Sequence, residues 1–444
     1  MAERGARRRV LMVVSAFRPA MIADMQRARM LAWELPALGW DVEVLAPRAS
    51  EVRQDVIEPE PDAFFAPDTR IHEVGSMARG VFEALGSRTH SWRTLWPMRQ
   101  RGSALLRAQR FDLVYFTTTT FVYLALGPHW NRQFGIPYVL DFHDPWVKER
   151  IATRRAQRWS SRAMEWLGER MERSAVVGAA GVVAVSPRYV ETLRRRYEAS
   201  NPRWLAPTRH AVIPFGARAA DLTEAARAPQ ASNRRARREI VLIYVGAGGA
   251  IMARSFILIC RAIAALRAQG SSLPDRARIT LFGTTYDWKP GQPKALEAAA
   301  QRVGVGDLVS ELPGRVSFRH SLESLLECDG ALILGVDDAG YMPSKLFSYA
   351  LSGKPLLASL HRDSPAFAQF QATPGLGRAL WFDDNGEMPI TDAAQVVASF
   401  LNAAATAESD DRRALLEPFL APTMSLRHAN LFDACLGEAL RAPR

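Results

Sequence analysis

A short segment at residues 341–355, with the sequence YMPSKLFSYALSGKP, is the part of the chain best suited to hold a phosphate group. It follows the apolar run 330–335 and leads into a second apolar run at 356–358. This pattern predicts a strand, a short loop, a helix that ends at a glycine, and another strand. Pro343 and Ser344 are typical of the first residues of a helix.

A helix that begins there would offer unpaired amides and the positive end of its dipole to an anion. We therefore expect the backbone amides of Ser344, Lys345 and Leu346 to receive a phosphate, with a ribose near Ser348, one turn further on. The alternative is an ordinary capped helix between two strands. Two of the five lysines of the chain lie in this segment, although arginine is otherwise the strongly preferred cation.

A glycine-rich loop follows another apolar run, at residues 240–245, and precedes a helical stretch. Gly246, Gly248 and Gly249 would allow the backbone to approach an anion closely. Arg254, shortly after, could clamp a diphosphate. The loop has no GK[ST] sequence and lacks the spacing of a dinucleotide fingerprint, so a tight strand-to-helix turn is the alternative interpretation.

A histidine and a carboxylate follow a third apolar run, in the sequence YVLDFHDPW at residues 138–146. His143 and Asp144, at the carboxyl end of a strand, could orient an acceptor hydroxyl, and they are the candidate catalytic residues. Thr118 and Thr119 follow the preceding strand and would lie on the same rim. The alternatives are a structural histidine and a helix-capping threonine.

A basic and aromatic region covers residues 87–110, with six arginines and no acidic residue. Trp92, Trp96, Arg99 and Arg101 are its candidate membrane contacts, because tryptophan and basic side chains together favour anionic membrane surfaces. A solvated helix face is the alternative. No nucleic-acid-binding motif accompanies the charge, so we expect no nucleic-acid partner.

The order of apolar runs and helical stretches predicts two α/β domains with parallel sheets. The first is expected at residues 1–215 and the second at 240–410. Residues 216–239 lack this pattern and are interpreted as a linker. Residues 411–444 are predicted to be C-terminal helices that pack back on the first domain. Ligands of such sheets bind at the carboxyl ends of the strands.

The composition agrees with a globular two-domain protein. The chain has 444 residues, an apolar content of 48% and a formal net charge of +11. Residues 1–200 carry 30 Arg and Lys against 22 Asp and Glu, so most of the excess positive charge lies in the first half. No uninterrupted apolar segment approaches the roughly 20 residues of a membrane span. Three dispersed cysteines, without CxxC spacing, predict buried thiols rather than disulfides or a zinc site.

These motifs, in this order, resemble those of retaining glycosyltransferase family 4 of the bacterial polysaccharide type. YVLDFHDPW resembles the family's acceptor-domain motif, VVAVSP and VIPFG resemble the end of its first domain, and PSKLFSYALSGKP resembles its donor helix. The resemblance implies the GT-B fold, in which two Rossmann-like domains face each other across a cleft. It also implies that Gly248, Gly249 and Arg254, with the amides of residues 344–346, receive the diphosphate of a nucleotide-sugar.

The chain departs from the family pattern at two places. Ser348 stands where the family usually has Glu or Asp, a carboxylate that normally binds the nucleotide ribose. The first loop, which typically carries paired glycines, instead holds Arg18 and Pro19. Arg18 is therefore placed with Thr118 and Thr119 at the acceptor side or the rim of the cleft.

We expect a glycosyltransferase that moves a sugar from a nucleotide-sugar to a lipid-linked or polysaccharide-precursor acceptor. The resemblance implies a retaining mechanism with no metal and no cofactor, the nucleotide-sugar being a substrate. The expected location is the cytoplasm, with peripheral attachment to the inner face of the plasma membrane. Two alternatives are a nucleotide-sugar epimerase of the same fold and a catalytically inactive, glycosyltransferase-like membrane scaffold subunit.

Overall fold

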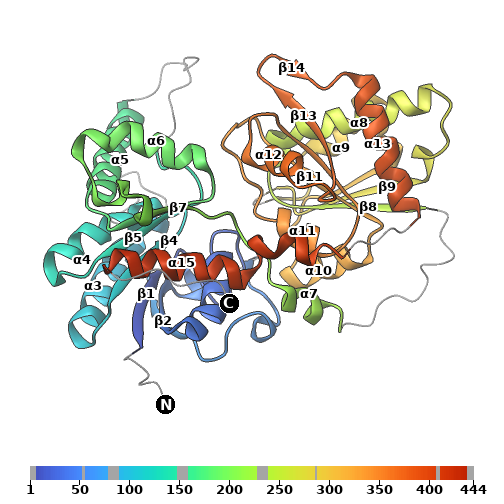
Figure 1. Cartoon of the computed structure of the whole chain (residues 1–444). Coiled ribbons are helices and arrows are strands. Elements are labelled where there is room, and N and C mark those ends of the chain that lie inside the picture. The colour runs from blue at the N-terminus through green and yellow to red at the C-terminus, as the bar shows by residue number, and fades with distance from the viewer. Residues whose placement is uncertain are drawn as a thin grey trace. The chain divides into compact units, whose positions relative to one another are not determined.

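The chain forms two α/β units, each built on its own seven-stranded sheet (Figure 1). The computed structural model describes residues 7–52, 56–78, 90–147, 159–227, 239–285, 288–406 and 411–437. The first unit comprises residues 1–215 together with 421–444, and the second comprises residues 216–420. Each unit is described separately.

The sheet of the first unit is parallel throughout. Its strands, in spatial order, are β3 (Arg70–Val74), β2 (Trp40–Pro47), β1 (Arg8–Val13), β4 (Leu113–Thr117), β5 (Tyr138–Phe142), β6 (Gly181–Ala184) and β7 (His210–Val212). Its helices are α1 (Gln26–Glu34), α3 (His90–Ala108), α4 (Leu126–Phe134), α5 (Trp159–Val177), α6 (Pro187–Tyr197) and α15 (Ala421–Cys435). The strand order reverses between β1 and β4, which is where doubly wound sheets bind ligands.

The sheet of the second unit repeats this plan, with one antiparallel strand at its edge. Its strands, in spatial order, are β10 (Val309–Leu312), β9 (Ala277–Phe282), β8 (Ile240–Val245), β11 (Gly330–Leu334), β12 (Leu356–His361), β13 (Arg378–Asp383) and β14 (Gly386–Glu387). Its helices are α7 (Ala219–Ala225), α8 (Ala253–Ala268), α9 (Ala295–Val303), α10 (Phe318–Glu327), α11 (Leu346–Leu351), α12 (Pro365–Ala372), α13 (Ile390–Ala405) and α14 (Arg413–Leu416). The reversal of strand order falls between β8 and β11.

Most strands predicted from the sequence are present, because nearly continuous apolar runs are typical of strands buried on both faces of a parallel sheet. In β4, β5, β6 and β11 every residue is buried. The α/β two-domain architecture is confirmed, and the three cysteines are buried as expected. The strands β3, β13 and β14 were not predicted.

The interpretation of residues 216–239 as a linker was wrong for its first part. Residues 219–225 form α7, because this alanine-rich stretch favours a helix and Asp221 lies in its first turn, paired with Arg218 at 3.0 Å. The helix packs on α10, where Arg319 pairs with Glu224 at 3.3 Å. It therefore belongs to the second unit. Residues 228–238 lie outside the described part of the chain.

The helix α8 is the one described helix that is long and apolar enough to cross a membrane, counted with the turn before it as Gly249–Ala268. Its mean hydropathy of 1.8 meets the criterion for a membrane-spanning helix. Its apolar side chains Phe256, Ile259 and Ile263 are instead buried in the core of the second unit. We therefore interpret α8 as a core helix.

The C-terminal helix α15 completes the first unit. Figure 1 shows it, in red, lying alongside the blue and teal elements of that unit. Asp433 pairs with Arg8 of β1 and accepts a hydrogen bond from Trp40 Nε1 at 3.1 Å. The ring of Phe432 packs against Trp40 with a centroid distance of 5.4 Å. The second unit extends to Leu420, ten residues beyond the predicted boundary at 410.

The helix α15 also buries an ionisable side chain, which makes stability depend on pH. His428 is fully buried, and its Nδ1 lies 2.7 Å from the carbonyl of Met424. Burial lowers the pKa of His428 to about 3, and the neighbouring Arg27 adds to the effect. The unfolded chain, with an ordinary histidine pKa of about 6.5, therefore takes up a proton before the folded chain does.

We expect the free energy of unfolding to decrease as the pH falls from about 6.5 towards the folded pKa. Between about pH 7 and pH 5 the contribution of His428 amounts to about 2 kcal/mol. Urea unfolding of the wild type and of the His428→Gln variant, at both pH values, measures it. The variant should lack this part of the pH dependence. If the free energy of unfolding fell by the same amount in both proteins between the two pH values, the prediction would be contradicted.

Candidate functional site

Two groups of polar side chains lie at the carboxyl ends of strands, one group in each unit. Both include residues from the point where strand order reverses. Each is described within its own unit.

In the second unit, a lysine amine lies against the glycine-rich loop. The loop follows β8, and Lys345 precedes α11 in the loop that follows β11. Lys345 Nζ donates a hydrogen bond to the carbonyl of Val245 at 2.7 Å. Burial, together with a smaller contribution from the charge of Arg315, lowers the pKa of Lys345 to about 8. The Lys345 amine thus lies at the β8–β11 reversal, where a bound anion would favour its charged form.

The glycines of this loop lie close to neighbouring side chains, and one of them has a positive φ. A Cβ at Gly246 would lie 2.6 Å from Tyr244 Oη and 3.2 Å from Lys345 Nζ. A Cβ at Gly248 would lie 2.7 Å from the Met252 side chain. Gly249 has a φ of 45°, which favours glycine. The loop therefore brings its backbone close to the Lys345 amine.

The expected set of phosphate-binding amides is corrected at three positions. The amide of Gly246 donates to Phe282 O at 2.9 Å, and that of Gly248 donates to Thr284 O at 3.0 Å. The amide of Leu346 donates to Pro343 O at 3.3 Å. The end of β9, the residues just after it and the turn before α11 thus accept the hydrogen bonds of amides that the sequence analysis assigned to a ligand.

The helix α11 differs from its prediction as well. It begins at Leu346, has six residues, and receives no hydrogen bond from a capping side chain. Its dipole is correspondingly small, so the cationic side chain of Lys345 is the stronger anion-attracting feature. Ser344 and Ser348 are partly exposed beside it.

Arg254, the predicted diphosphate clamp, is held by contacts within the second unit. Its guanidinium pairs with Asp337 at 2.8 Å and donates to the carbonyls of Asp383 and Gly386. It also stacks over the Phe382 ring, with its central carbon 4.9 Å from the centroid. Arg254 therefore joins the loop after β11 to the β13–β14 hairpin.

One group of described side chains has the composition of a metal site. Ligand atoms of Asp337, His361 and Asp384 lie within 4.8 Å of one another. Asp337 and Asp384 are exposed, and Arg254 already pairs with Asp337. A guanidinium in this position competes with a cation for the carboxylate, so this group does not by itself indicate a metal.

In the first unit, a buried ion pair holds the predicted histidine. Asp141 in β5 and Arg27 in α1 are fully buried, with Arg27 Nε 2.7 Å from Asp141 Oδ2. The same oxygen lies 2.8 Å from His143 Nε2 and accepts hydrogen bonds from Tyr115 and Thr117. Burial alone would raise the pKa of Asp141, but the Arg27 guanidinium and His143 hold it well below its usual range.

This network fixes the tautomer of His143. Because Thr117 Oγ1 donates its proton to Asp141, it can only accept at its 3.0 Å contact with His143 Nε2. Nε2 therefore carries the proton, and Nδ1 is buried without a hydrogen-bond partner among the described residues. The adjacent Asp144 is exposed. Asp141 and Arg27 were missed by the sequence interpretation, which selected Asp144.

A second carboxylate joins the loops after β1 and β4. Asp24 Oδ2 accepts hydrogen bonds from Ser15 Oγ and from Thr119 Oγ1, the latter at 3.0 Å. Asp24 Oδ1 is buried, with no partner among the described residues. Thr118 is fully buried and accepts from the Thr120 amide at 2.9 Å, so it shapes the turn.

Arg18, the third predicted rim residue, pairs with Asp62 in the first unit. This contact ties the loop after β1 to the chain near residue 62. The loop itself is anchored by the buried side chains of Ala16 and Ala20, which pack with Val56.

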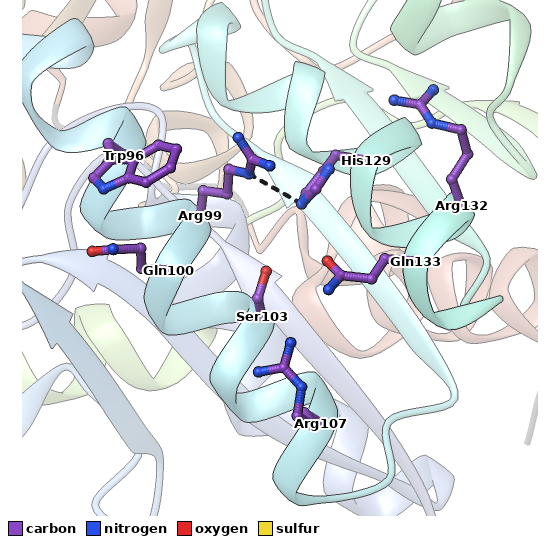
Figure 2. Close-up of a pocket in the computed structure, with 8 residues that line it drawn as sticks. All are labelled: Trp96, Arg99, Gln100, Ser103, Arg107, His129, Arg132 and Gln133. Atoms are coloured by element: carbon purple, nitrogen blue, oxygen red, sulfur yellow. Dashed lines mark hydrogen bonds between the residues drawn. The ribbon is translucent and has the colours of Figure 1, made fainter.

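The four residues predicted to contact a membrane lie on different faces of α3. Trp96 and Arg99 line a groove between α3 and α4 (Figure 2). Arg101 instead points towards β3, where its Nη2 lies 3.3 Å from His72 Nδ1. Trp92 is partly buried and is not among the residues that line the groove.

The comparisons with known proteins agree with this architecture. Residues 25–216 match the family described as "Glycosyl transferase 4-like domain". The match covers most of the continuous part of the first unit, including the Asp141 network. No curated protein matches the chain. The domain match and the fold together support a glycosyltransferase.

Several solved structures share the fold over nearly the whole chain. Alr3699/HepE of Anabaena, in complex with UDP-glucose, has a TM-score of 0.60 at 13% identity, over 96% of this chain and 99% of its own. A glycosyltransferase from Rickettsia africae has a TM-score of 0.61 at 12% identity, over 97% and 99%. A UDP-forming α,α-trehalose-phosphate synthase from Burkholderia vietnamiensis gives 0.54 at 14%, over 97% and 96%. At such identities the likeness shows the GT-B fold alone.

Proposed function

We propose that this protein transfers a sugar, with retention of configuration and without a metal, from a nucleotide-sugar to a lipid-linked or polysaccharide-precursor acceptor. The observation that carries the proposal is the Lys345 amine, seated against Val245 beside Gly246. A nucleoside diphosphate leaving group gains negative charge as the sugar departs. A preorganised cation in a partly desolvated position stabilises that charge.

UDP is the first nucleotide to test, since structures that share the fold contain UDP or UDP-glucose. In the proposed reaction, Lys345 and Arg315 offset the charge of the diphosphate, and Ser344 and Ser348 offer hydroxyls to the donor. A front-face displacement, in which the donor phosphate helps to deprotonate the acceptor, needs no nucleophile from the protein.

The first unit would supply the acceptor-side groups. His143 Nδ1 and Asp24 Oδ1 have no hydrogen-bond partner among the described residues. Both suit the hydroxyl groups of a sugar. We propose a cytoplasmic location at the inner face of the membrane, where a lipid-linked acceptor would be found.

A thermal-shift series with UDP-, GDP-, ADP-, CMP- and dTDP-sugars tests the donor part of the proposal. A donor present at about 100 times its dissociation constant should stabilise the fold by about 2.7 kcal/mol. The Lys345→Met variant should lose this shift, whereas Lys294→Met, a lysine paired with Glu297 at 3.1 Å, should keep it. No shift with any of the nucleotide-sugars would overturn the donor assignment.

Label transfer then separates the enzyme classes. A sugar label that reaches an extracted lipid or glycan acceptor supports transfer, and interconversion of the free nucleotide-sugar would indicate an epimerase. Donor binding with neither reaction would indicate the scaffold alternative, for which Ser348, in place of a carboxylate, is the motivation. Activity that a chelator abolishes would contradict metal independence.

A further inference from the structure

The groove between α3 and α4 has features of an anion site that the proposed donor and acceptor groups do not use. It has a volume of about 440 Å³ and is lined by Trp96, Arg99, Gln100, Ser103 and Arg107 of α3 and by His129, Arg132 and Gln133 of α4 (Figure 2). The two helices pack tightly on each other: a Cβ at Gly102 of α3 would lie 2.2 Å from the buried Trp130 ring of α4. The groove is therefore held by closely packed helices.

Within the part of the chain that the structure describes, no carboxylate compensates the charge in this groove. None of its eight lining residues is acidic, and among the described residues no ion pair involves Arg99, Arg107 or Arg132. Arg99 Nε donates to His129 Nε2 at 3.1 Å, the contact drawn in Figure 2. Three guanidinium groups that line one groove without a neighbouring carboxylate create a positive potential that favours binding of an anion.

Exposed aromatic side chains flank the same face. Trp96 is 47% exposed at the edge of the groove, and Arg99 stacks on its ring at 5.1 Å. Trp166 on α5 is 57% exposed, with Arg170 stacked on it at 4.8 Å. Exposed tryptophan next to arginine is typical of surfaces that sit at the lipid headgroup level.

The basic surface continues from one groove to the next. Arg132 lines a second groove, between α4 and α5, together with Arg170 and Arg173. The helix α4 contacts both α3 and α5, so the three helices form one face. An isolated phosphate would need only one groove, whereas a lipid surface offers many phosphates and an apolar layer for the tryptophans.

We propose that the groove between α3 and α4 binds the phosphate group of an anionic lipid, and that Trp96 and Trp166 seat the same face in the membrane interface. This site adds to the proposed function the chemical class of the lipid that the first unit would bind. It rests on the proposed function only in assuming that the protein works at a membrane. Donor binding and lipid binding can therefore fail separately.

The contact between Arg99 and His129 predicts a dependence on pH. His129 is neutral when Nε2 accepts the Arg99 hydrogen bond, and burial, together with Arg99 and Arg132, lowers its pKa. The other charged groups of the groove and its neighbour are also cations: Arg107, Arg170 and Arg173. A bound phosphate offsets these charges and allows His129 to take up a proton. Lipid binding should then strengthen as the pH falls.

Co-sedimentation of the full chain with vesicles tests the proposal. The vesicles contain phosphatidylcholine alone or with about one third phosphatidylglycerol, at low salt. The Arg99→Gln/Arg132→Gln variant should bind the anionic vesicles about 30-fold more weakly, since each basic residue near such a surface contributes about 1 kcal/mol. Arg302→Gln/Arg413→Gln removes two exposed arginines from the second unit and should match the wild type.

Two further measurements separate the groove from general charge attraction. Tryptophan emission should shift to shorter wavelength on anionic vesicles, and the shift should be smaller in Trp96→Ala. Binding at about pH 5.5 should exceed binding at about pH 7.5 in the wild type but not in His129→Gln.

Several results would overturn the proposal. These are no binding to anionic vesicles at low salt, equal losses in the groove and control variants, or binding to a DNA duplex as tight as to vesicles. The wild type could instead bind inorganic phosphate saturably but not bind vesicles, with the groove variant losing the phosphate binding. That result would assign the groove to a soluble phosphate. If the groove variant keeps its thermal shift with the nucleotide-sugar, the donor site is intact whatever the outcome for the groove.

Discussion

Replacing Lys345 with methionine is expected to lower sugar transfer by about 100- to 1000-fold, the range found when one preorganised electrostatic donor is removed from an active site. The Lys345 amine is held against Val245 O beside a glycine loop with no room for a Cβ at Gly246. Methionine keeps the length and the apolar contacts of the side chain but removes its charge. Initial rates with the donor identified by thermal shift measure the loss.

The control for this prediction is Lys294→Met, which removes a partly exposed lysine from the same unit. Wild-type rates in both variants would refute a role for Lys345 in the reaction. A loss confined to the Michaelis constant for the donor would mean that Lys345 binds the ground state and the transition state equally.

The pKa of Lys345 provides an independent test of its contact with the diphosphate. Its value of about 8 lies below the ordinary lysine pKa, because burial and Arg315 disfavour the charged form. A bound diphosphate favours that form, so donor binding should take up a proton near and above pH 8 and weaken as the pH rises further. Calorimetry in two buffers of different ionisation enthalpy measures the uptake, which Lys345→Arg should abolish.

Replacing Asp141 with asparagine is expected to destabilise the first unit by about 3–5 kcal/mol, the cost of leaving a buried charge without its partner. Arg27, fully buried, would lose its ion pair at 2.7 Å, and His143, Tyr115 and Thr117 would lose their common acceptor. Urea unfolding at neutral pH measures the change. A change below about 1 kcal/mol would contradict this account of the buried ion pair.

A paired substitution separates the buried charge from packing. In Arg27→Met/Asp141→Leu both charges are replaced by apolar side chains, so no unpaired ion remains. This variant should recover a large part of the stability lost in Asp141→Asn. It should not recover transfer, because His143 would lack the acceptor that keeps the proton on Nε2.

The sequence predicted those parts of the protein that depend on local pattern. Parallel strands buried on both faces appear as apolar runs, so β8 and β11, expected at residues 240–245 and 330–335, were found almost to the residue. A glycine loop after β8 and a lysine after β11 could be placed at one sheet edge from topology alone. These features need no knowledge of distant contacts.

The residues that were missed or misassigned depend on partners far away in the sequence. Arg254 looked like a diphosphate clamp because it follows a glycine loop, but it pairs with Asp337 and the backbone near Asp383. Arg27 looked like one more arginine on a helix, yet it is fully buried and holds Asp141. Neither pairing can be predicted from the residues next to it in the sequence.

Element boundaries produced the remaining differences. The linker was assigned because residues 216–238 lack a strand pattern, but a short helix such as α7 gives little signal over seven residues. The predicted phosphate amides were misassigned for a similar reason. Gly246 donates to Phe282 at the end of β9 and Gly248 donates to Thr284 just after it, and only the folded sheet places these acceptors beside the loop.

The contribution of α15 makes the first unit discontinuous in sequence, and this affects the order in which the protein can fold. The stretch that matches the known domain ends at residue 216, whereas Asp433 and Phe432 close over Arg8 and Trp40 at the start of the chain. On the ribosome, the second unit is complete before α15 has been made. The unit whose synthesis starts first is therefore the one that finishes its core last.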